Sequence, residues 1–371
     1  MSCATIVFRT DASLDIGTGH VMRCLTLADA LRKHGASCRF VCRAHPGNLL
    51  DVIRQQGFEA HALPIAVEQP RRQDTLAKLR PTYAPWLGAD WTVDLQQTLD
   101  VLGDRSVDWL VVDHYALDAR WERGLRSACR HLMVIDDLAD RPHECDLLLD
   151  QNLGRTRAEY ANLVQAGCKV LASPKYALLR PEFAALRPYS LARSESSHVR
   201  HLLITLGGVD KSNLTTSVLD GLMDCPLPSD CHITVVMGPH APWLEHVRDR
   251  VERMPWVTEL KVNACNMAKL MADSDLAIGA AGTTAWERCC LALPTLTAVL
   301  ADNQQEGASA LQAAGAVLLL GNRIPVAREL RAKLPLLLAP NTRAKMRKAC
   351  QSITDGAGTG RLVMELNHAL L

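Results

Sequence analysis

The chain has 371 residues, of which 48% are hydrophobic and 22% charged, and its formal net charge is +1. This length exceeds what one ordinary hydrophobic core holds, so it predicts two soluble domains. The near-neutral charge excludes the basic surface that nucleic acid requires, and no apolar stretch is long enough to span a bilayer.

The N-terminus and the cysteines carry no targeting or metal-binding signal. Residues 1–9 run into a strand pattern without the basic and long apolar regions of a signal peptide, so we expect a cytoplasmic protein with no membrane partner. Among the thirteen cysteines the nearest spacings are Cys38 to Cys42 and the adjacent pair Cys289 and Cys290, with no C-x-x-C. We therefore expect reduced thiols and no metal site.

In the first half of the chain, short apolar strands alternate with amphipathic helices. The predicted strands are 6–9, 38–42, 109–113 and 132–136, and the predicted helices are 21–34 and 49–56. This alternation with short loops predicts an α/β fold with a parallel, doubly wound sheet. No regular element is predicted for 69–103, which contains three prolines.

A second half of the same plan follows a polar stretch. Residues 194–197 read Ser-Glu-Ser-Ser, after which the predicted elements are a strand at 201–206, a helix from Asn213 and strands at 233–237, 276–278 and 295–299. We expect an N-terminal Rossmann-like domain over 1–186, a linker over 187–199 and a C-terminal Rossmann-like domain over 200–371. The last helix can pack back on the first domain.

The segment Gly17-Thr18-Gly19-His20 follows the first predicted strand and opens the first predicted helix. Backbone N–H groups at a helix start lack intrahelical acceptors and attract anions. The segment lacks the third glycine and the downstream acid of a dinucleotide fingerprint, and the chain has no G-x-x-x-x-G-K-[ST] loop, so no nucleotide cofactor is expected. His20 is either a structural residue of the helix start or, held neutral by the helix dipole, a general base.

Three acidic segments have competing interpretations. Asp113-His114-Tyr115 ends a predicted strand, where it can either contact a ligand or cap the next helix. Asp136-Asp137 would point to opposite faces of a strand, which makes a poor chelate. Asp273-Ser274-Asp275 has the D-x-D spacing of metal-dependent transferases but precedes its strand, so we interpret it as a helix end and turn.

Two glycine loops in the second half can hold phosphate. Gly207-Gly208 follows a strand and precedes Ser212 and Asn213, which can cap a helix. Gly279 to Gly282, with Thr283 and Thr284, leads into a helix that carries Glu287. Its backbone N–H groups and hydroxyls can hold a diphosphate while the carboxylate accepts two ribose hydroxyls.

Amide side chains follow the last of the predicted strands. Asn303-Gln304-Gln305-Glu306 opens another helix after the strand at 295–299. Such amides suit the hydroxyl and amide groups of a sugar, although a solvated helix start is the ordinary alternative.

In this order the segments resemble the glycosyltransferase B superfamily, in which two Rossmann-like domains face each other across a cleft. They are particularly similar to the UDP-N-acetylglucosamine transferases that make the lipid-linked peptidoglycan precursor. Within the superfamily, the chain looks like the UDP-sugar hydrolases of pseudaminic acid biosynthesis. The matching strings are Arg9 to Ser13, Ile16 to Arg23, Val112 to Tyr115, Asp136 to Leu138, His143 to Asp146, Tyr176 to Phe183 and Trp286-Glu287.

The resemblance implies a site, a substrate and no metal or cofactor. It makes His20 the catalytic base, places Tyr115 beside the sugar and makes Arg180, Glu287 and Asn303 substrate-binding residues. The other residues predicted to bind substrate are Asp11, Gly17, Gly19, Gly207, Gly208, Gly282, Thr283, Thr284 and Gln304. Two positions depart from the family pattern. Val209 stands where a hydroxyl residue is usual, and Asp150-Gln151-Asn152 stands where Asn-Gln-Asn is usual.

Three functions remain open at this point. The favoured one is metal-independent hydrolysis of a UDP-linked 2,4-diacetamido-2,4,6-trideoxy sugar, with water attacking the anomeric carbon and inverting it. UDP leaves as a stable anion, so this reaction needs charge neutralisation and an activated water more than acid catalysis. The alternatives are an inverting UDP-sugar glycosyltransferase and a non-catalytic UDP-sugar binding protein. The sequence carries no indication of oligomeric state.

Overall fold

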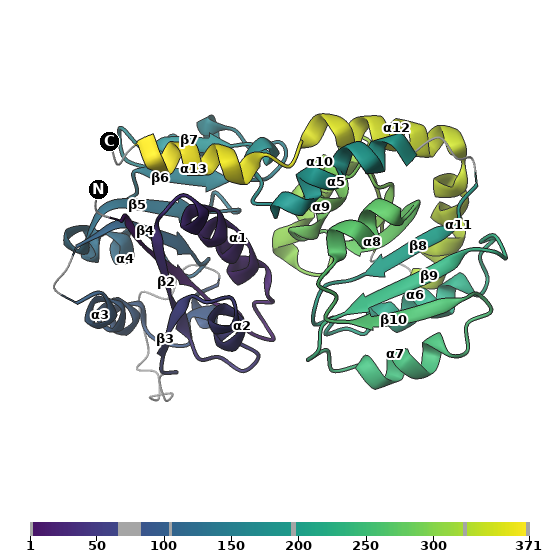
Figure 1. The fold of residues 1–371 in the computed structure, drawn as a ribbon, viewed down its shortest axis with the longest axis horizontal. Helices are drawn as coiled ribbons and strands as arrows, with labels where there is room; N and C mark the ends of the chain where they lie inside the picture. Colours follow the sequence, from purple (N-terminus) through teal and green to yellow (C-terminus); the bar gives the residue numbers. More distant parts are fainter. Residues whose placement is uncertain (1–2, 66–82, 104–105, 194–197, 322–324, 369–371) are drawn as a thin grey trace. The chain divides into compact units, whose positions relative to one another are not determined.

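The computed structural model describes residues 3–65, 83–103, 106–193, 198–321 and 325–368. Two parallel sheets, one of seven strands and one of six, organise the chain. The chain divides into two compact units, the first formed by Met1–Leu178 with Thr359–Leu371 and the second by Leu179–Gly358 (Figure 1).

The first sheet is doubly wound, with the strand order β3-β2-β1-β4-β5-β6-β7 and parallel pairing throughout. Its strands are β1 (Thr5–Thr10), β2 (Ser37–Arg43), β3 (Glu59–Leu63), β4 (Val107–Asp113), β5 (Cys129–Ile135), β6 (Leu147–Asp150) and β7 (Lys169–Ala172). The helices of this unit are α1 (Gly19–Lys33), α2 (Leu50–Gln55), α3 (Trp91–Leu102), α4 (Ala119–Gly124) and α13 (Gly358–His368).

The C-terminal helix α13 belongs to the first unit. Its apolar residues Leu362, Val363 and Leu366 are buried in the same core as α1 and the first sheet. Trp109 on β4 donates from Nε1 to the carbonyl oxygen of Leu366 at 3.3 Å. Figure 1 shows α13, in yellow, lying beside β6 and β7. The core around β4 is therefore built from residues that precede and follow the second unit.

The second sheet repeats the plan, with the strand order β10-β9-β8-β11-β12-β13. Its strands are β8 (His201–Thr205), β9 (His232–Met237), β10 (Thr258–Val262), β11 (Leu276–Ala280), β12 (Thr295–Ala298) and β13 (Val317–Leu320). The helices are α5 (Pro181–Ala192), α6 (Leu214–Leu222), α7 (Leu244–Val251), α8 (Met267–Asp273), α9 (Thr284–Cys290), α10 (Gln305–Ala313), α11 (Val326–Leu338) and α12 (Pro340–Ile353).

In each sheet the direction of winding reverses once, between β1 and β4 in the first and between β8 and β11 in the second. The loops on either side of such a reversal diverge at the carboxyl ends of the strands and leave a crevice in which ligands bind. The predicted site segments of both units follow these strands or their neighbours.

The predicted strands and helices are confirmed, with boundaries within three residues, while several further elements were not predicted. The edge strands β3 and β10 escape a sequence search because exposed and charged residues interrupt their apolar pattern. Within 69–103, residues 69–82 lie outside the described residues. The rest contains α3, which Asp90 caps by accepting the N–H of Thr92 at 3.0 Å.

The structure places the boundary between the units differently from the expected linker over 187–199. The second unit begins at Leu179, and α5 continues to Ala192, so the first part of the expected linker is helical. Pro181 occupies the first turn, where proline is well tolerated. Pro188 lies inside the same helix. Because proline usually ends a helix, the sequence around it resembles a linker.

Candidate active site

A buried histidine and carboxylate meet where β4 ends and α1 begins. His20 is 8% exposed and Asp113 is fully buried. Nδ1 of His20 lies 2.6 Å from Oδ1 of Asp113. A carboxylate at this distance accepts the Nδ1 proton, which leaves the lone pair on Nε2. In the part of the chain that the structure describes, Nε2 makes no hydrogen bond, so it can accept a proton from a ligand or a water.

Arg23, one turn further along α1, keeps Asp113 ionised. Its Nε and Nη2 donate to the two oxygens of Asp113 at 2.6 and 2.7 Å. Burial alone would raise the pKa of Asp113, but Arg23 and His20 outweigh it and hold that pKa well below its usual range. An ionised Asp113 fixes the imidazole tautomer and stabilises the imidazolium that forms when His20 takes a proton.

Tyr115 forms an aromatic wall beside His20. The two rings meet edge to face with their centroids 4.5 Å apart, and the ring of Trp86 stacks on Tyr115 with its centroid 5.8 Å away. The hydroxyl of Tyr115 donates to Oδ2 of Asp137 at 2.6 Å, and Nη1 of Arg23 lies 2.7 Å from the same oxygen. Tyr115 is thus beside the proposed base, while its contact with a sugar stays a prediction.

The loop before α1 has the form expected of an anion-binding turn. Gly17 has φ of +80°, in the left-handed region, and its N–H donates to the carbonyl oxygen of Ser13 at 2.8 Å. No side chain caps the start of α1, whose first residue is Gly19. The N–H groups of this first turn therefore remain available to an anionic ligand.

Asp11 lies in a buried ionic network rather than at an open surface. Both of its oxygens accept from Arg9, at 2.6 and 2.9 Å, and Oδ1 also accepts the N–H of Arg43 at 2.6 Å. Nε2 of His114 lies 3.2 Å from Oδ2. The side chain is fully buried, so its contacts support a structural role, and direct substrate binding by Asp11 stays a prediction.

Asp136 and Asp137 diverge, as expected for consecutive residues at a strand end. Asp136 is fully buried and accepts from Arg141 at 2.8 Å. Asp137 faces Arg23 and Tyr115 instead. The two carboxylates therefore have different direct partners.

In the second unit, β11 leads through Gly282 into α9. The backbone N–H groups of Gly282 and Thr283 make no hydrogen bond within the described ranges, and no side chain caps α9. Ala285 instead donates to the carbonyl oxygen of Gly282 at 2.8 Å, which closes the turn. These donors at a helix start are suited to an anion.

A buried arginine lies directly under this loop. Arg288 is 1% exposed and donates to the carbonyl oxygen of Ala280 at 2.5 Å and to Oγ1 of Thr284 at 3.1 Å. Burial lowers its pKa to about 10, so it stays charged at neutral pH. A Cβ at Gly279 would lie 2.6 Å from Nη1 of Arg288, so any larger residue there would require the guanidinium to shift. The sequence analysis did not identify Arg288.

Glu287 and Arg180 come together in the same unit. Oε1 of Glu287 lies 3.8 Å from Nη2 of Arg180, whose Nη1 is 3.3 Å from Glu182. Burial raises the pKa of Glu287 to about 7 against the lowering effect of Arg180. Two residues predicted from separate motifs are thus neighbours, and their contact with substrate stays a prediction.

The loop after β8 differs from its expected form. Asp210, rather than Ser212 or Asn213, caps α6, because its two oxygens accept the N–H groups of Leu214 and Thr215 at 2.9 and 2.8 Å. Asn213 has a left-handed backbone, and its side chain accepts from Thr216 instead. The helix start therefore already carries a carboxylate. Phosphate binding at Gly207 and Gly208 stays a prediction.

The amide segment after β12 borders the α9 loop. Gln304 accepts the N–H of Leu300 at 3.0 Å, and its Nε2 lies 3.7 Å from where a Cβ of Gly282 would be. Asn303 is half-buried in the same short turn, Asp302–Gln304. This arrangement brings the two predicted segments together at the carboxyl ends of β11 and β12.

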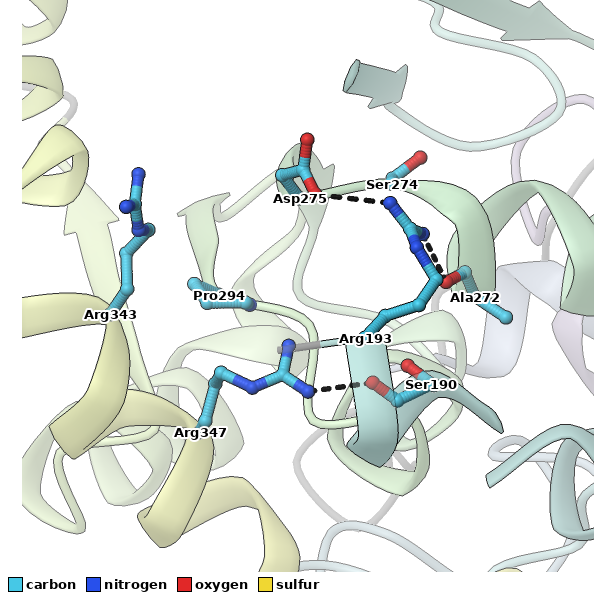
Figure 2. Close-up of a pocket in the computed structure, with 8 residues that line it drawn as sticks. All are labelled: Ser190, Arg193, Ala272, Ser274, Asp275, Pro294, Arg343 and Arg347. Carbon is cyan, nitrogen blue, oxygen red and sulfur yellow. Dashed lines mark hydrogen bonds and ion pairs between the residues drawn. The ribbon is translucent and has the colours of Figure 1, made fainter. Parts of the chain in front are cut away.

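The D-x-D segment lies at the opposite edge of the second sheet, as expected. Asp273 ends α8 and Asp275 precedes β11. Figure 2 shows a pocket at this edge, where Arg193 from the end of α5 contacts Asp275 at 3.1 Å and Arg347 from α12 donates to Ser190. None of the predicted site residues lines this pocket.

Sequence reasoning missed the partners of the predicted residues more than the residues themselves. Asp113 was identified without its role, and Arg23 was only part of a matched string. Trp86 comes from the stretch for which no element was predicted. The local sequence Tyr83-Ala84-Pro85-Trp86 is dense in aromatic residues, and this was the available signal.

Comparison with known proteins finds distant relatives of the chain. No family model matches the chain. The chain is 25% identical to an uncharacterized protein of Methanocaldococcus jannaschii over 81% of its length, but spans only 57% of that protein. It is 24% identical over 84% of its length to the UDP-2,4-diacetamido-2,4,6-trideoxy-beta-L-altropyranose hydrolase of Campylobacter jejuni, of which it spans 97%.

Two further comparisons concern part of the chain and the whole fold. Over 43% of its length the chain is 33% identical to the spore coat polysaccharide biosynthesis protein SpsG of Bacillus subtilis, of which it spans 45%. The structure resembles that of Acinetobacter baumannii MurG with a TM-score of 0.61 and 17% identity, covering 99% and 100% of the two chains. The structure also resembles that of the calicheamicin glycosyltransferase CalG4, with a TM-score of 0.63 and 14% identity, covering 100% of this chain and 99% of that one.

The chain has the glycosyltransferase B fold. Two parallel sheets with the same winding, each with its predicted site segments at the carboxyl ends of its strands, agree with this assignment. Among the described helices, none combines the length and the apolar character needed to cross a bilayer.

Proposed function

We propose that the protein hydrolyses a UDP-linked 2,4-diacetamido-2,4,6-trideoxy sugar to the free sugar and UDP. The Campylobacter relative, whose length the chain spans almost completely, carries the name of such a hydrolase. The observation that best supports this proposal is the pairing of Asp113 with Nδ1 of His20. Nε2 of His20 has no protein partner among the described residues. A non-catalytic binding protein has no need of a buried, ionised carboxylate that prepares a histidine as a base.

In the proposed reaction His20 removes a proton from water as the oxygen attacks the anomeric carbon. The bond from that carbon to the UDP oxygen breaks, and its electrons leave with UDP. The proton on Nε2 then passes to solvent, which returns His20 to its neutral form. The α9 loop, with its N–H groups and Arg288 beneath, is suited to the diphosphate, whose leaving needs no proton because it is a stable anion.

The test is to incubate the purified protein with the UDP-diacetamido sugar and to measure UDP release with and without a sugar acceptor. We expect release at the same rate in both and free sugar as the product. Release that depends on an acceptor would make the protein a glycosyltransferase. Binding of the UDP-sugar with no release in either condition would indicate a binding protein.

The bond that breaks is predicted to be the one at the anomeric carbon. In ¹⁸O-labelled water, mass spectrometry should find the label on the anomeric hydroxyl of the sugar and none in UDP. A single histidine base supports direct displacement with inversion, because no second carboxylate is proposed as a covalent nucleophile. NMR immediately after mixing should show the inverted anomer first. Label in the terminal phosphate of UDP would contradict the mechanism.

Glu287 is predicted to bind the ribose of UDP. Glu287→Ala should weaken UDP binding by roughly 1–3 kcal/mol, the range for lost hydrogen bonds to a charged group. Because the pKa of Glu287 is raised to about 7 and ribose hydroxyls donate to the ionised form, wild-type affinity should rise with pH through 7. Glu287→Gln should lose this component, while the ionisation of UDP itself affects both proteins equally.

Calorimetry at pH 6 and pH 8 measures both effects. Glu245→Gln is the matched control, since the Glu245 side chain is 81% exposed at the start of α7 in the same unit. Unchanged affinity in a folded Glu287→Ala variant would remove this residue from the nucleotide site.

A further inference from the structure

Asp150 is a buried acid beside the proposed active site whose role is not yet explained. It is the last residue of β6 and is fully buried. Four groups with titratable or charged side chains face it: Asp136 and Asp137 from the end of β5, Tyr160 from a short turn, and Arg155 from the loop before that turn.

The hydrogen bonds around Tyr160 leave one proton missing. The hydroxyl oxygen of Tyr160 lies 3.0 Å from Oδ2 of Asp136 and 2.8 Å from Oδ2 of Asp150. A tyrosine hydroxyl carries one proton and can serve one of these acceptors. Two oxygens at 2.8 Å without a proton between them would repel, so the second contact requires a proton on the other partner.

Asp136 is not the residue that carries this proton. Oδ1 accepts from Arg141 at 2.8 Å, and Oδ2 accepts the N–H of Ala139 at 2.8 Å. These partners outweigh burial and lower the pKa of Asp136 to about 2. Asp136 is therefore ionised, and the Tyr160 proton points to it.

Asp150 lacks comparable stabilisation of a negative charge. Its Oδ1 accepts from the N–H and Nδ2 of Asn152 at 2.8 and 2.9 Å, as a neutral carbonyl oxygen can. The nearest described cationic atom, Nε of Arg155, is 3.5 Å from Oδ2, and Arg155 also pairs with Glu159 at 2.8 Å. Burial, with Asp137 next in importance, raises the pKa of Asp150 to about 7.

Asn152 connects Asp150 to the residues around His20. Its Nδ2 lies 2.9 Å from Oδ1 of Asp150 and 3.2 Å from Oδ1 of Asp137. The other oxygen of Asp137 accepts from Tyr115 and Arg23, and Arg23 holds Asp113. One amide thus lies between the buried acid and the carboxylate that positions the aromatic wall.

We propose that Asp150 is a positioning residue that works as a neutral carboxylic acid, donating its proton to Tyr160 and so leaving Asp137 as the charged partner of Arg23 and Tyr115. Ionisation of Asp150 would remove the donor to Tyr160 and set two negative charges on either side of the Asn152 amide. Asp137 would then shift, and with it Tyr115 and Arg23. The effect on turnover rests on the proposed function, whereas the protonation state does not.

The first test measures protonation without using activity. The melting temperatures of the wild type and Asp150→Asn are compared from pH 4 to pH 8.5. The folded protein holds this proton up to about pH 7 while an unfolded aspartate loses it near pH 4, so wild-type stability falls across this interval. Asn supplies an N–H donor and a carbonyl oxygen in the same shape. The difference, variant minus wild type, should therefore rise between pH 4 and 7 and then level off.

Asp51→Asn is the control, because this carboxylate is 87% exposed in the same unit. It should show no such rise. The proposal is overturned if the Asp150→Asn difference is flat with pH or falls as pH rises. If Asp150→Asn does not fold, carbon NMR of the wild-type protein, labelled at the carboxyl carbon of aspartate, tests the proposal instead. One aspartate should titrate near pH 7, and its absence would also overturn the proposal.

The second test uses turnover and depends on the proposed reaction. In the wild type, kcat should fall as Asp150 ionises above about pH 7, and the ratio of variant to wild-type kcat should increase from pH 6 to pH 8.5. A constant ratio would overturn the positioning role. If neither protein turns over the UDP-sugar, the proposed function fails, and the stability and NMR results still decide whether Asp150 is neutral.

Discussion

Replacing His20 with asparagine should lower kcat by roughly 10²- to 10⁴-fold, the range for loss of a general base, and leave UDP affinity nearly unchanged. The variant keeps a polar side chain that can still bond to Asp113 but has no nitrogen that accepts the proton from water. UDP binding should survive because the proposed nucleotide loop belongs to the other structural unit. Steady-state UDP release and calorimetry with UDP measure the two quantities.

His34→Asn is the matched control, because His34 follows the last residue of the same helix and is exposed. It should retain wild-type kcat. Equal losses of UDP affinity and kcat in His20→Asn would identify His20 as a binding or structural residue, which is the alternative that the sequence leaves open.

Replacing Asp113 with asparagine should also lower kcat by a factor on the order of 10²–10⁴, for a different reason. An asparagine can turn its amide N–H toward Nδ1 of His20, which moves the ring proton to Nε2 and removes the base. Arg23 also loses Asp113 as an ion-pair partner, although it keeps its ion pair with Asp137 at 2.7 Å. We expect lower stability together with the loss of kcat.

The decisive measurement separates these two effects. At a temperature where Asp113→Asn is fully folded by circular dichroism, kcat should remain low and its dependence on pH should change, because the carboxylate that stabilises the imidazolium is gone. Asp108→Asn serves as the control, because it removes a partly exposed carboxylate near the start of β4, at the opposite end of the strand from Asp113. Recovery of wild-type kcat by Asp113→Asn in its folded temperature range would leave Asp113 with a structural role only.

The elements that the sequence predicts are those with continuous buried apolar runs. β1, β4 and β11 are almost fully buried, so their patterns are unbroken, and the glycines that follow them identify the carboxyl edges of the sheets. The edge strands β3 and β10 and helix α3 lack such runs, whereas β6 and β13 have short apolar runs that were not predicted. The position of His20 can be predicted from the local sequence, because a strand, a glycine turn and a helix start follow one another in the chain.

The partners of these residues depend on contacts between distant segments, which local patterns do not report. The pairing of Asp113 with His20 joins β4 to α1, and that of Arg180 with Glu287 joins α5 to α9. Asp210 shows the same difficulty within one loop. Three residues there can cap α6, and the fold of the loop brings the side chain of Asp210 to the N–H groups of the helix start.

The return of α13 to the first unit affects the order in which a newly made chain can complete its folds. The seven-stranded sheet is synthesised before the second unit, but α13, which buries part of its face, is synthesised after the second unit. The first unit therefore stays incomplete until the chain that follows the second unit has been made. Until Leu366 reaches Trp109, the apolar residues of the first core that α13 covers are exposed to chaperones and to aggregation.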